Sequence, residues 1–165
     1  MIRQKDRILN IVNDYLIKNN AIVSVSIKYT DRTDCKAYMD SSQKDKFKYT
    51  IGYNPELWES KLKKPEYDNF DYARDIVSTM LHEATHIISH HRNLNSTDGD
   101  YGFEKLLYDN YLNSNYKVMK GAEILGISEE EYQKYLDERP DNFYTNYINY
   151  INYLIGFTNE ISNTI

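Results

Sequence analysis

Hydrophobic and polar residues alternate along the chain with two different periods. Near the amino terminus, apolar residues recur every three or four positions, which predicts a helix over residues 3–18. Its apolar stripe consists of Ile8, Leu9, Val12, Tyr15 and Leu16. Residues 21–29, 36–39 and 47–53 follow, and the first and last of these stretches alternate between apolar and polar side chains, as half-buried strands do. We expect the three stretches to form a small antiparallel sheet.

The rest of the chain has helical periodicity. Asn54-Pro55 ends the third strand and opens a short helix over residues 55–62. A long helix is predicted over residues 71–92. After a polar loop over residues 93–102, the pattern predicts further helices over residues 103–112, 117–125, 128–138 and 141–157. No internal repeat or linker interrupts the pattern, so we predict a single domain over residues 1–165 of the α+β class, with a helical carboxyl-terminal half.

The helix predicted over residues 71–92 has an unusual composition for a helix at a protein surface. Its apolar residues fall at the spacing of a buried stripe: Ala73, Ile76, Val77, Met80, Ala84, Ile87 and Ile88. Between residues 76 and 91, the only acidic or basic side chain apart from histidine is Glu83. Because a surface helix normally has charges on its outer face, we expect this helix to be covered on most sides. A single carboxylate in such a setting is costly unless it has a partner or a chemical task.

The same helix contains an HExxH motif, His82-Glu83-Ala84-Thr85-His86. Residues four apart lie on one helix face, so both imidazoles can reach one metal ion, with Glu83 beside them. All four histidines of the chain lie within residues 82–91. The pattern predicts a zinc site with His82 and His86 as metal ligands and Glu83 as the catalytic residue.

The third ligand of this zinc site is not fixed by the motif. A catalytic zinc usually has three protein ligands and one open position. No histidine follows His91, so the third ligand is His90, a carboxylate, or missing. Glu104 is our first choice, because it lies near the start of a predicted helix that can pack beside the motif helix. Asp98 and Asp100, in the preceding loop, are the alternatives, and for His90 we favour a supporting role.

The predicted site has the groups that peptide hydrolysis requires. Zinc lowers the pKa of bound water to about 7 and polarises a carbonyl. Glu83 would act as general base on zinc-bound water and then deliver the proton to the leaving amine. Tyr101 or Tyr108 is a candidate donor to the oxyanion, and the strand over residues 47–53 is a candidate edge for binding an extended peptide. The predicted function is that of a zinc-dependent metalloendopeptidase acting on a protein or peptide substrate.

The composition and charge of the chain argue against several other classes of protein. The net charge of −5 and the pI of about 5.4 argue against sequence-independent binding of nucleic acid, which needs a basic surface. Cys35 is the only cysteine, so no intramolecular disulfide can form. The amino terminus lacks the apolar run of a secretory signal, and no stretch approaches the roughly 20 apolar residues of a membrane span. We therefore expect a cytoplasmic protein that binds neither nucleic acid nor membrane.

The motif helix and the segment after it resemble the ImmA/IrrE family of zincin metallopeptidases. The likeness rests on HEATHIISH, in which His90 is the extra histidine, on FEKLLYDNYL, in which Glu104 falls at that family's glutamate ligand, and on AEILGIS. It covers roughly residues 47–138 and implies a zincin-like fold and the cleavage of a repressor or regulator linked to mobile elements or stress. The chain is also similar to the SprT-like family, through its strand, its Asn-Pro, its motif helix and the stretch from Gly99 to Phe103. That second resemblance would imply proteolysis near DNA, but the third histidine of that family has no counterpart here.

A non-catalytic protein is the alternative hypothesis. Such a protein would keep the zincin fold for binding or regulation, with the metal holding the structure together and no turnover. The third ligand decides between the catalytic and the non-catalytic hypothesis. Without it the site has only two protein ligands, whereas a catalytic zinc usually has three.

Overall fold

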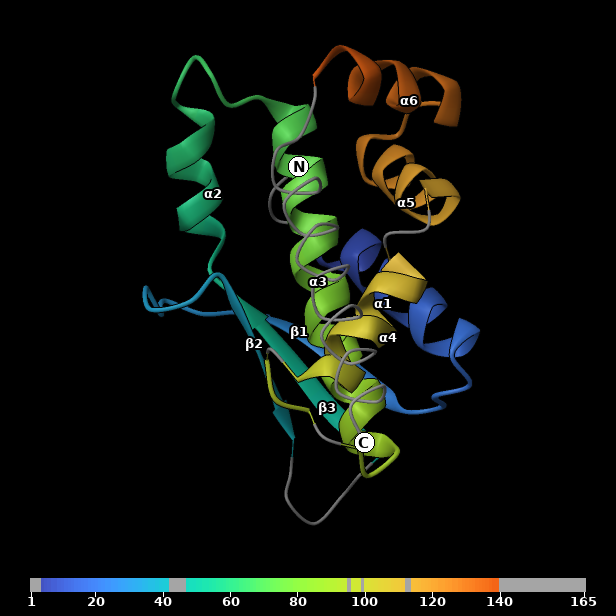
Figure 1. The fold of residues 1–165 in the computed structure, drawn as a ribbon. Helices are drawn as coiled ribbons and strands as arrows, with labels where there is room; N and C mark the ends of the chain where they lie inside the picture. Colours follow the sequence, from blue (N-terminus) through green and yellow to red (C-terminus); the bar gives the residue numbers. More distant parts are fainter. Residues whose placement is uncertain (1–3, 42–46, 95, 99, 112–113, 140–165) are drawn as a thin grey trace, which may run out of the picture.

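The structure, a computed structural model, describes residues 4–41, 47–94, 96–98, 100–111 and 114–139. Within these residues the chain forms six helices and three strands around one long central helix, α3 (Figure 1). The helices are α1 (Lys5–Lys18), α2 (Pro55–Leu62), α3 (Asn69–His91), α4 (Tyr101–Tyr111), α5 (Ser114–Leu125) and α6 (Glu129–Glu138). The strands are β1 (Ser24–Tyr29), β2 (Ala37–Ser41) and β3 (Lys48–Tyr53). The α+β class predicted from the sequence is confirmed.

The central helix α3 has a strong local start signal and a buried body. At its amino terminus the Asp68 carboxylate accepts a hydrogen bond from the Asp71 N–H at 3.2 Å, and the Asp71 carboxylate accepts one from the Asp68 N–H at 2.9 Å. Beyond its last turn the chain reverses at Asn93, whose φ of 59° is a left-handed conformation that asparagine tolerates. All residues of the predicted apolar stripe are at most 3% exposed. The prediction of a helix covered on most sides is therefore confirmed.

The sheet is mixed, and the prediction of an antiparallel sheet is wrong. The strand order is β1-β3-β2, with β3 antiparallel to β2 and parallel to β1. Ile51 lies opposite Met39 on one side and opposite Ile27 on the other. Short connections between successive strands favour antiparallel neighbours, but they do not determine which strand lies in the centre. The connection after β1 passes the position of β3, so the later strand fills the middle and its residues are the most buried of the sheet.

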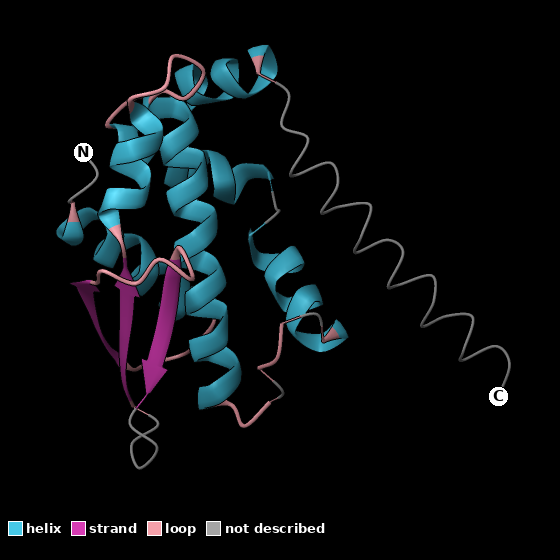
Figure 2. Cartoon of the chain, turned by 90° about the vertical axis from the view of Figure 1, so that its left-hand side faces the viewer, coloured by secondary structure: helices cyan, strands magenta, loops and turns pink. Residues whose placement is uncertain are grey.

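The sheet forms one layer, and α1 and α3 pack against it as a second layer (Figure 2). Helix α1 contacts β1, whereas α3 lies nearest to β2. The two helices are joined by a buried hydrogen bond of 2.8 Å between the hydroxyls of Tyr15 and Thr85. The Thr85 hydroxyl donates to the Leu81 carbonyl at 2.7 Å, so it accepts the proton of Tyr15. This pairing fixes α3 against α1.

The remaining helices cover the other side of α3. Both α4 and α5 pack on α3, and α6 packs on α5. The ring of Phe70, at the start of α3, lies 5.2 Å from the ring of Tyr132 on α6. These helices match the predictions over residues 103–112, 117–125 and 128–138, and the helix predicted over residues 141–157 lies outside the described residues. Among the helices of the described part of the chain, none combines the length and apolar character that crossing a membrane requires.

Candidate metal centre

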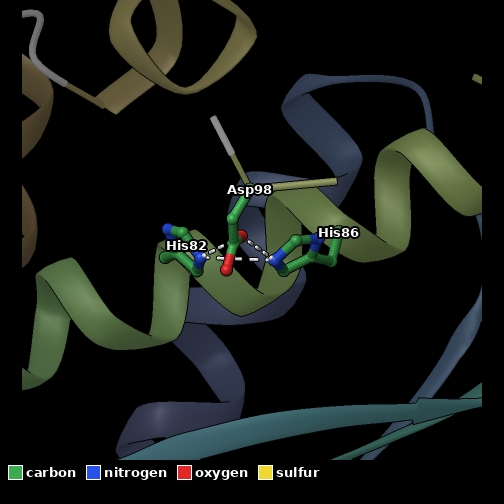
Figure 3. Close-up of side chains that lie close together, drawn as sticks. All are labelled: His82, His86 and Asp98. Atoms are coloured by element: carbon green, nitrogen blue, oxygen red, sulfur yellow. Dashed lines mark hydrogen bonds and ion pairs between the residues drawn. The ribbon is translucent and has the colours of Figure 1, made fainter. Parts of the chain in front are cut away.

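Two histidines and one aspartate converge beside the carboxyl-terminal half of α3 (Figure 3). The Nε2 atoms of His82 and His86, one helical turn apart, are separated by 3.2 Å. The Oδ1 atom of Asp98, from the segment between α3 and α4, lies 3.1 Å from the His82 nitrogen and 2.8 Å from the His86 nitrogen. Within the described residues this is the set of three potential metal ligands whose atoms lie within 4.8 Å of one another.

Ser96 determines which nitrogen of His86 carries the proton. Its Oγ lies 2.9 Å from Nδ1 of His86, and its hydroxyl donates to the backbone carbonyl of the same residue at 3.3 Å. Because a hydroxyl has one proton to donate, its oxygen is left to accept from the Nδ1–H of His86. The neutral imidazole then has its lone pair on Nε2, the atom that faces Asp98. This tautomer is the one that a metal-ligating histidine needs.

The tautomer of His86 makes its contact with Asp98 unfavourable unless a cation lies between them. Burial, together with the neighbouring His82, lowers the pKa of His86 although Asp98 acts to raise it, so the ring is neutral at pH 7. A neutral His86 brings a lone pair to within 2.8 Å of a carboxylate oxygen. A proton on Nε2 of His82 does not relieve this repulsion, because that proton lies between His82 and its own neighbours and not between His86 Nε2 and Asp98 Oδ1. The site therefore fits a cation bound by Nε2 of each histidine and by Oδ1 of Asp98.

The separations of these atoms suit zinc. Bonds of 2.0–2.2 Å from zinc to nitrogen or oxygen place tetrahedral ligands about 3.3–3.6 Å apart. The observed separations of 2.8–3.2 Å are shorter than this by about half an ångström or less. Two imidazoles and a carboxylate are also a ligand set that zinc accepts, and the exposed side chain of Asp98 (70%) leaves the site open to solvent. An open position distinguishes a catalytic zinc site from a structural one.

Phe103, on α4, holds the two imidazoles in place. Its ring stacks on His86 at 4.3 Å between centroids with an interplanar angle of 19°, and it meets His82 edge-on at 5.3 Å. The side chain is 1% exposed, so the stack cannot move without disturbing the packing of α4 on α3. A rigid apolar surface behind the ligands restricts their rotation and thus favours the convergent geometry.

Glu83 lies next to the ligands and faces the free edge of the sheet. Its carboxylate accepts a hydrogen bond from the backbone of Met39 on β2, and the residue is 9% exposed. Burial raises the pKa of Glu83 to about 8, and the nearby carboxylate of Asp98 adds to this effect, whereas the Met39 hydrogen bond opposes it. A carboxyl group whose pKa lies near neutrality is suited to take up and release a proton at physiological pH.

An open cleft of about 470 Å³ leads from these residues along α3. His82 and Glu83 lie at one end, and Ser78 and Thr79 follow on the helix. Ala37, the first residue of β2, lies on the opposite side. The edge strand beside the cleft is therefore β2; the prediction that assigned this place to residues 47–53 is wrong, because β3 occupies the centre of the sheet.

The structure separates the candidates for the third ligand. Asp98 joins the two histidines, as one of the alternatives foresaw. Asp100 instead caps α4, because its Oδ2 accepts the Phe103 N–H at 3.2 Å. Glu104 is 6% exposed on the first turn of α4 and, among the described residues, lies outside the group formed by the histidines and Asp98. Its role as a ligand stays a prediction.

The other residues singled out in the sequence lie at the edge of the site or away from it. Nδ1 of His90 lies 2.8 Å from the Tyr49 hydroxyl, which joins α3 to β3 and agrees with a supporting role. His91 packs edge-on against Phe47 at 5.3 Å. Of the two oxyanion candidates, Tyr108 does not line the cleft, and the side chain of Tyr101 lies outside what the structure describes.

Three contributors to the site have no signal in the sequence. Ser96, Met39 and Phe103 act through a hydroxyl, a backbone N–H and a ring contact, and none belongs to the motif. Comparison of the chain with protein-family models, with curated proteins and with solved structures found no match. The resemblances to the ImmA/IrrE and SprT-like families therefore stay predictions.

Proposed function

We propose that this protein is a zinc-dependent metallopeptidase of the zincin class that hydrolyses a peptide bond in a protein or peptide substrate. The observation that carries the proposal is the convergence of His82, His86 and Asp98 on one point, with Ser96 directing a lone pair of His86 toward that point. The placement of Glu83 beside the ligands and at the end of an open cleft supports hydrolysis as the reaction.

In this proposal His82, His86 and Asp98 hold the metal and Glu83 transfers the proton. Zinc, when bound, supplies a Lewis acid that activates water and polarises the substrate carbonyl. Glu83 accepts a proton from the attacking water and then donates it to the amine nitrogen that leaves. The Met39 N–H orients the carboxylate during both transfers, because it occupies one of the carboxylate lone pairs.

The free edge of β2 is suited to binding an extended peptide. The Lys36 carbonyl accepts the Asn54 N–H at 3.3 Å, which places the hydrogen-bonded pairs of this ladder at Lys36 and at alternate residues after it. The backbone groups of Ala37 and Ser41 and the carbonyl of Met39 consequently point to the free edge, while the Met39 N–H already donates to Glu83. A substrate strand added at this edge would pass Glu83 and the metal ligands.

The test combines metal analysis with hydrolysis. Purified protein should contain about one zinc per chain by inductively coupled plasma mass spectrometry and should cleave an unfolded, fluorescence-quenched protein substrate. Glu83→Gln should keep the zinc and lose cleavage by at least a hundredfold, since the amide cannot take the proton. Glu130→Gln, an exposed glutamate on α6, is the matched control and should retain both properties.

The same experiment separates catalysis from a structural metal. If zinc binds and raises the melting temperature while neither protein cleaves the substrate, the metal holds the fold together and the peptidase proposal is wrong. If no zinc binds and cleavage is unchanged by chelation, both the metal site and the proposed chemistry are wrong.

A further inference from the structure

The cleft ends, away from Glu83, in a group of charged side chains. Asp75 precedes Glu83 by eight residues on α3, which corresponds to about 12 Å along the helix axis. On the opposite side, Lys36 precedes Met39 by three residues, or about 10 Å of extended strand. A peptide lying along β2 spans this distance with about three residues. The charged end therefore lies three residues from the bond that Glu83 would act on.

Asp75 is the centre of this group and is well supplied with donors. Its Oδ2 accepts from Trp58 Nε1 at 3.1 Å, from the Tyr67 hydroxyl at 3.2 Å and from Lys61 Nζ at 3.4 Å. Lys36 Nζ lies 3.1 Å from Oδ1 and 3.3 Å from Oδ2. Because Trp58, Tyr67 and Lys61 also donate to this carboxylate, it does not depend on Lys36 alone.

Of the two lysines that pair with Asp75, Lys36 is the one that lines the cleft. It lines the cleft together with Asp75, whereas Lys61 does not, and its side chain is 49% exposed. An ammonium group has three protons to donate, and among the described residues Asp75 is the acceptor found for it. Lys36 can therefore turn a proton toward a ligand in the cleft while keeping its contact with Asp75.

The charged side chains at this end form ion pairs with one another. Two cations, Lys36 and Arg74, and two anions, Asp71 and Asp75, line this end of the cleft, and Lys61 lies outside the lining. Asp71 is engaged by Arg74 at 3.3 Å and by the Asp68 N–H at 2.9 Å. Each anion is thus paired with a cation and accepts at least one further hydrogen bond from the protein.

We propose that this end of the cleft is a carboxylate-binding subsite, in which Lys36 holds an acidic group of the substrate about three residues from the cleaved bond. This inference rests on the proposed peptidase function, because it assumes that a peptide lies along the cleft. An acidic group gains the protons of Lys36 that Asp75 does not use. A basic residue at the same place would face Lys36 with both anions already engaged.

A peptide-capture experiment tests the subsite. The Glu83→Gln protein, supplied with zinc, is presented with a library of acetylated and amidated decapeptides that contain either Asp/Glu or Asn/Gln at matched positions. Captured peptides should be enriched in Asp/Glu about fivefold, as expected for an ion pair at a partly exposed site. A second library with free carboxyl termini and no acidic side chains distinguishes a terminal carboxylate from a side-chain carboxylate as the ligand.

Two variants assign the preference to Lys36. Lys36→Met removes the ammonium and keeps an unbranched side chain, so the enrichment should disappear in both libraries. Lys61→Met is the matched control, because Lys61 also pairs with Asp75 but does not line the cleft, and it should retain the enrichment. Circular dichroism confirms that both variants are folded.

The outcomes distinguish the subsite from the enzyme. Enrichment that survives in Lys36→Met, or no capture or enrichment with the parent protein, overturns the subsite. Enrichment without cleavage by the wild-type protein supports the subsite and overturns the peptidase function. Cleavage by the wild-type protein with no acidic preference leaves the peptidase function in place and overturns the subsite.

Discussion

Glu83 accepts a hydrogen bond from the backbone N–H of Met39, so the carboxylate beside the metal ligands is bound to the edge strand of the sheet. This contact joins two elements that are separated by about forty residues of chain. It places the proton acceptor at the strand edge where a peptide would lie. The same burial that allows the contact raises the pKa of Glu83.

The first prediction concerns the stability of the metal-free protein as a function of pH. The folded pKa of Glu83 is about 8, above its usual value near 4.5, so between these values the folded state binds more protons than the unfolded state. Stability contributed by this group is full below about pH 4.5 and is lost as the pH rises toward 8, with a slope of at most about 1.4 kcal/mol per pH unit. Urea unfolding in the presence of a chelator at pH 5, 6.5 and 8 measures the slope.

Glu83→Gln is the reference for this measurement. The amide is neutral at every pH, so the difference in unfolding free energy between the two proteins should grow as the pH rises, with the variant more stable at pH 8. Parallel pH profiles for the two proteins would show that Glu83 titrates at its ordinary pKa. Burial of the carboxylate would then not control its protonation.

The second prediction concerns the third metal ligand. Asp98→Asn should lower zinc affinity at least a hundredfold, because it removes the anionic oxygen that lies within 3.1 Å of both histidine nitrogens. Glu104→Gln should lower it less than tenfold, because Glu104 lies outside the ligand group in the described structure. Competition with a chromophoric chelator measures both affinities.

The reverse ranking would assign the metal to Glu104 and would require the segment around Asp98 to move aside when zinc binds. His82→Ala and His86→Ala calibrate the experiment, since each removes a ligand in either arrangement. Asp109→Asn, an exposed carboxylate on α4, is a control that should leave the affinity unchanged.

The third prediction concerns Ser96, which directs the proton of His86. Ser96→Ala removes the acceptor for Nδ1–H, so the imidazole can adopt the other tautomer, and zinc affinity should fall about tenfold to a hundredfold. Ser96→Thr keeps the hydroxyl and should restore most of the affinity. Equal losses in both variants would mean that the site is sensitive to packing at this position and not to the hydroxyl.

The elements that the sequence predicts well are those fixed by local chemistry. Asn54-Pro55 starts α2 at its predicted residue, since the Asn54 side chain accepts the Glu56 N–H at 3.1 Å and proline fits the first helical turn. The stripe of α3 is buried because its spacing matches the helical period. The two histidine positions follow from the same period.

The features that escape prediction depend on contacts between distant segments. Strand order cannot be read from alternation, because β1 and β3 have the same pattern whether they are neighbours or not. The ligand set has the same difficulty: Asp98 and Glu104 are both carboxylates at plausible spacing, and the choice depends on how the segment after α3 folds back. The hydroxyl of Ser96 acts only because that segment returns to His86.

The fourth prediction concerns Asp75 and acid stability. Burial acts to raise the pKa of Asp75, but the ammonium of Lys36, with further help from Lys61 and Trp58, outweighs it and holds the pKa below its usual value. The stability that these contacts provide is therefore full above about pH 4 and is lost as the pH falls through the folded pKa.

Asp75→Asn should lower the unfolding free energy at pH 7 by about 1–3 kcal/mol, because the amide keeps an acceptor for Trp58 but loses both ion pairs. At pH 3 the two proteins should differ by less, since this pH lies below the usual pKa of the carboxyl group and proton uptake then favours the unfolded wild-type chain. Urea unfolding at both pH values measures the difference, and a deficit that is the same at pH 3 and pH 7 would mean that the shape of the side chain, and not its charge, is what the surrounding donors require.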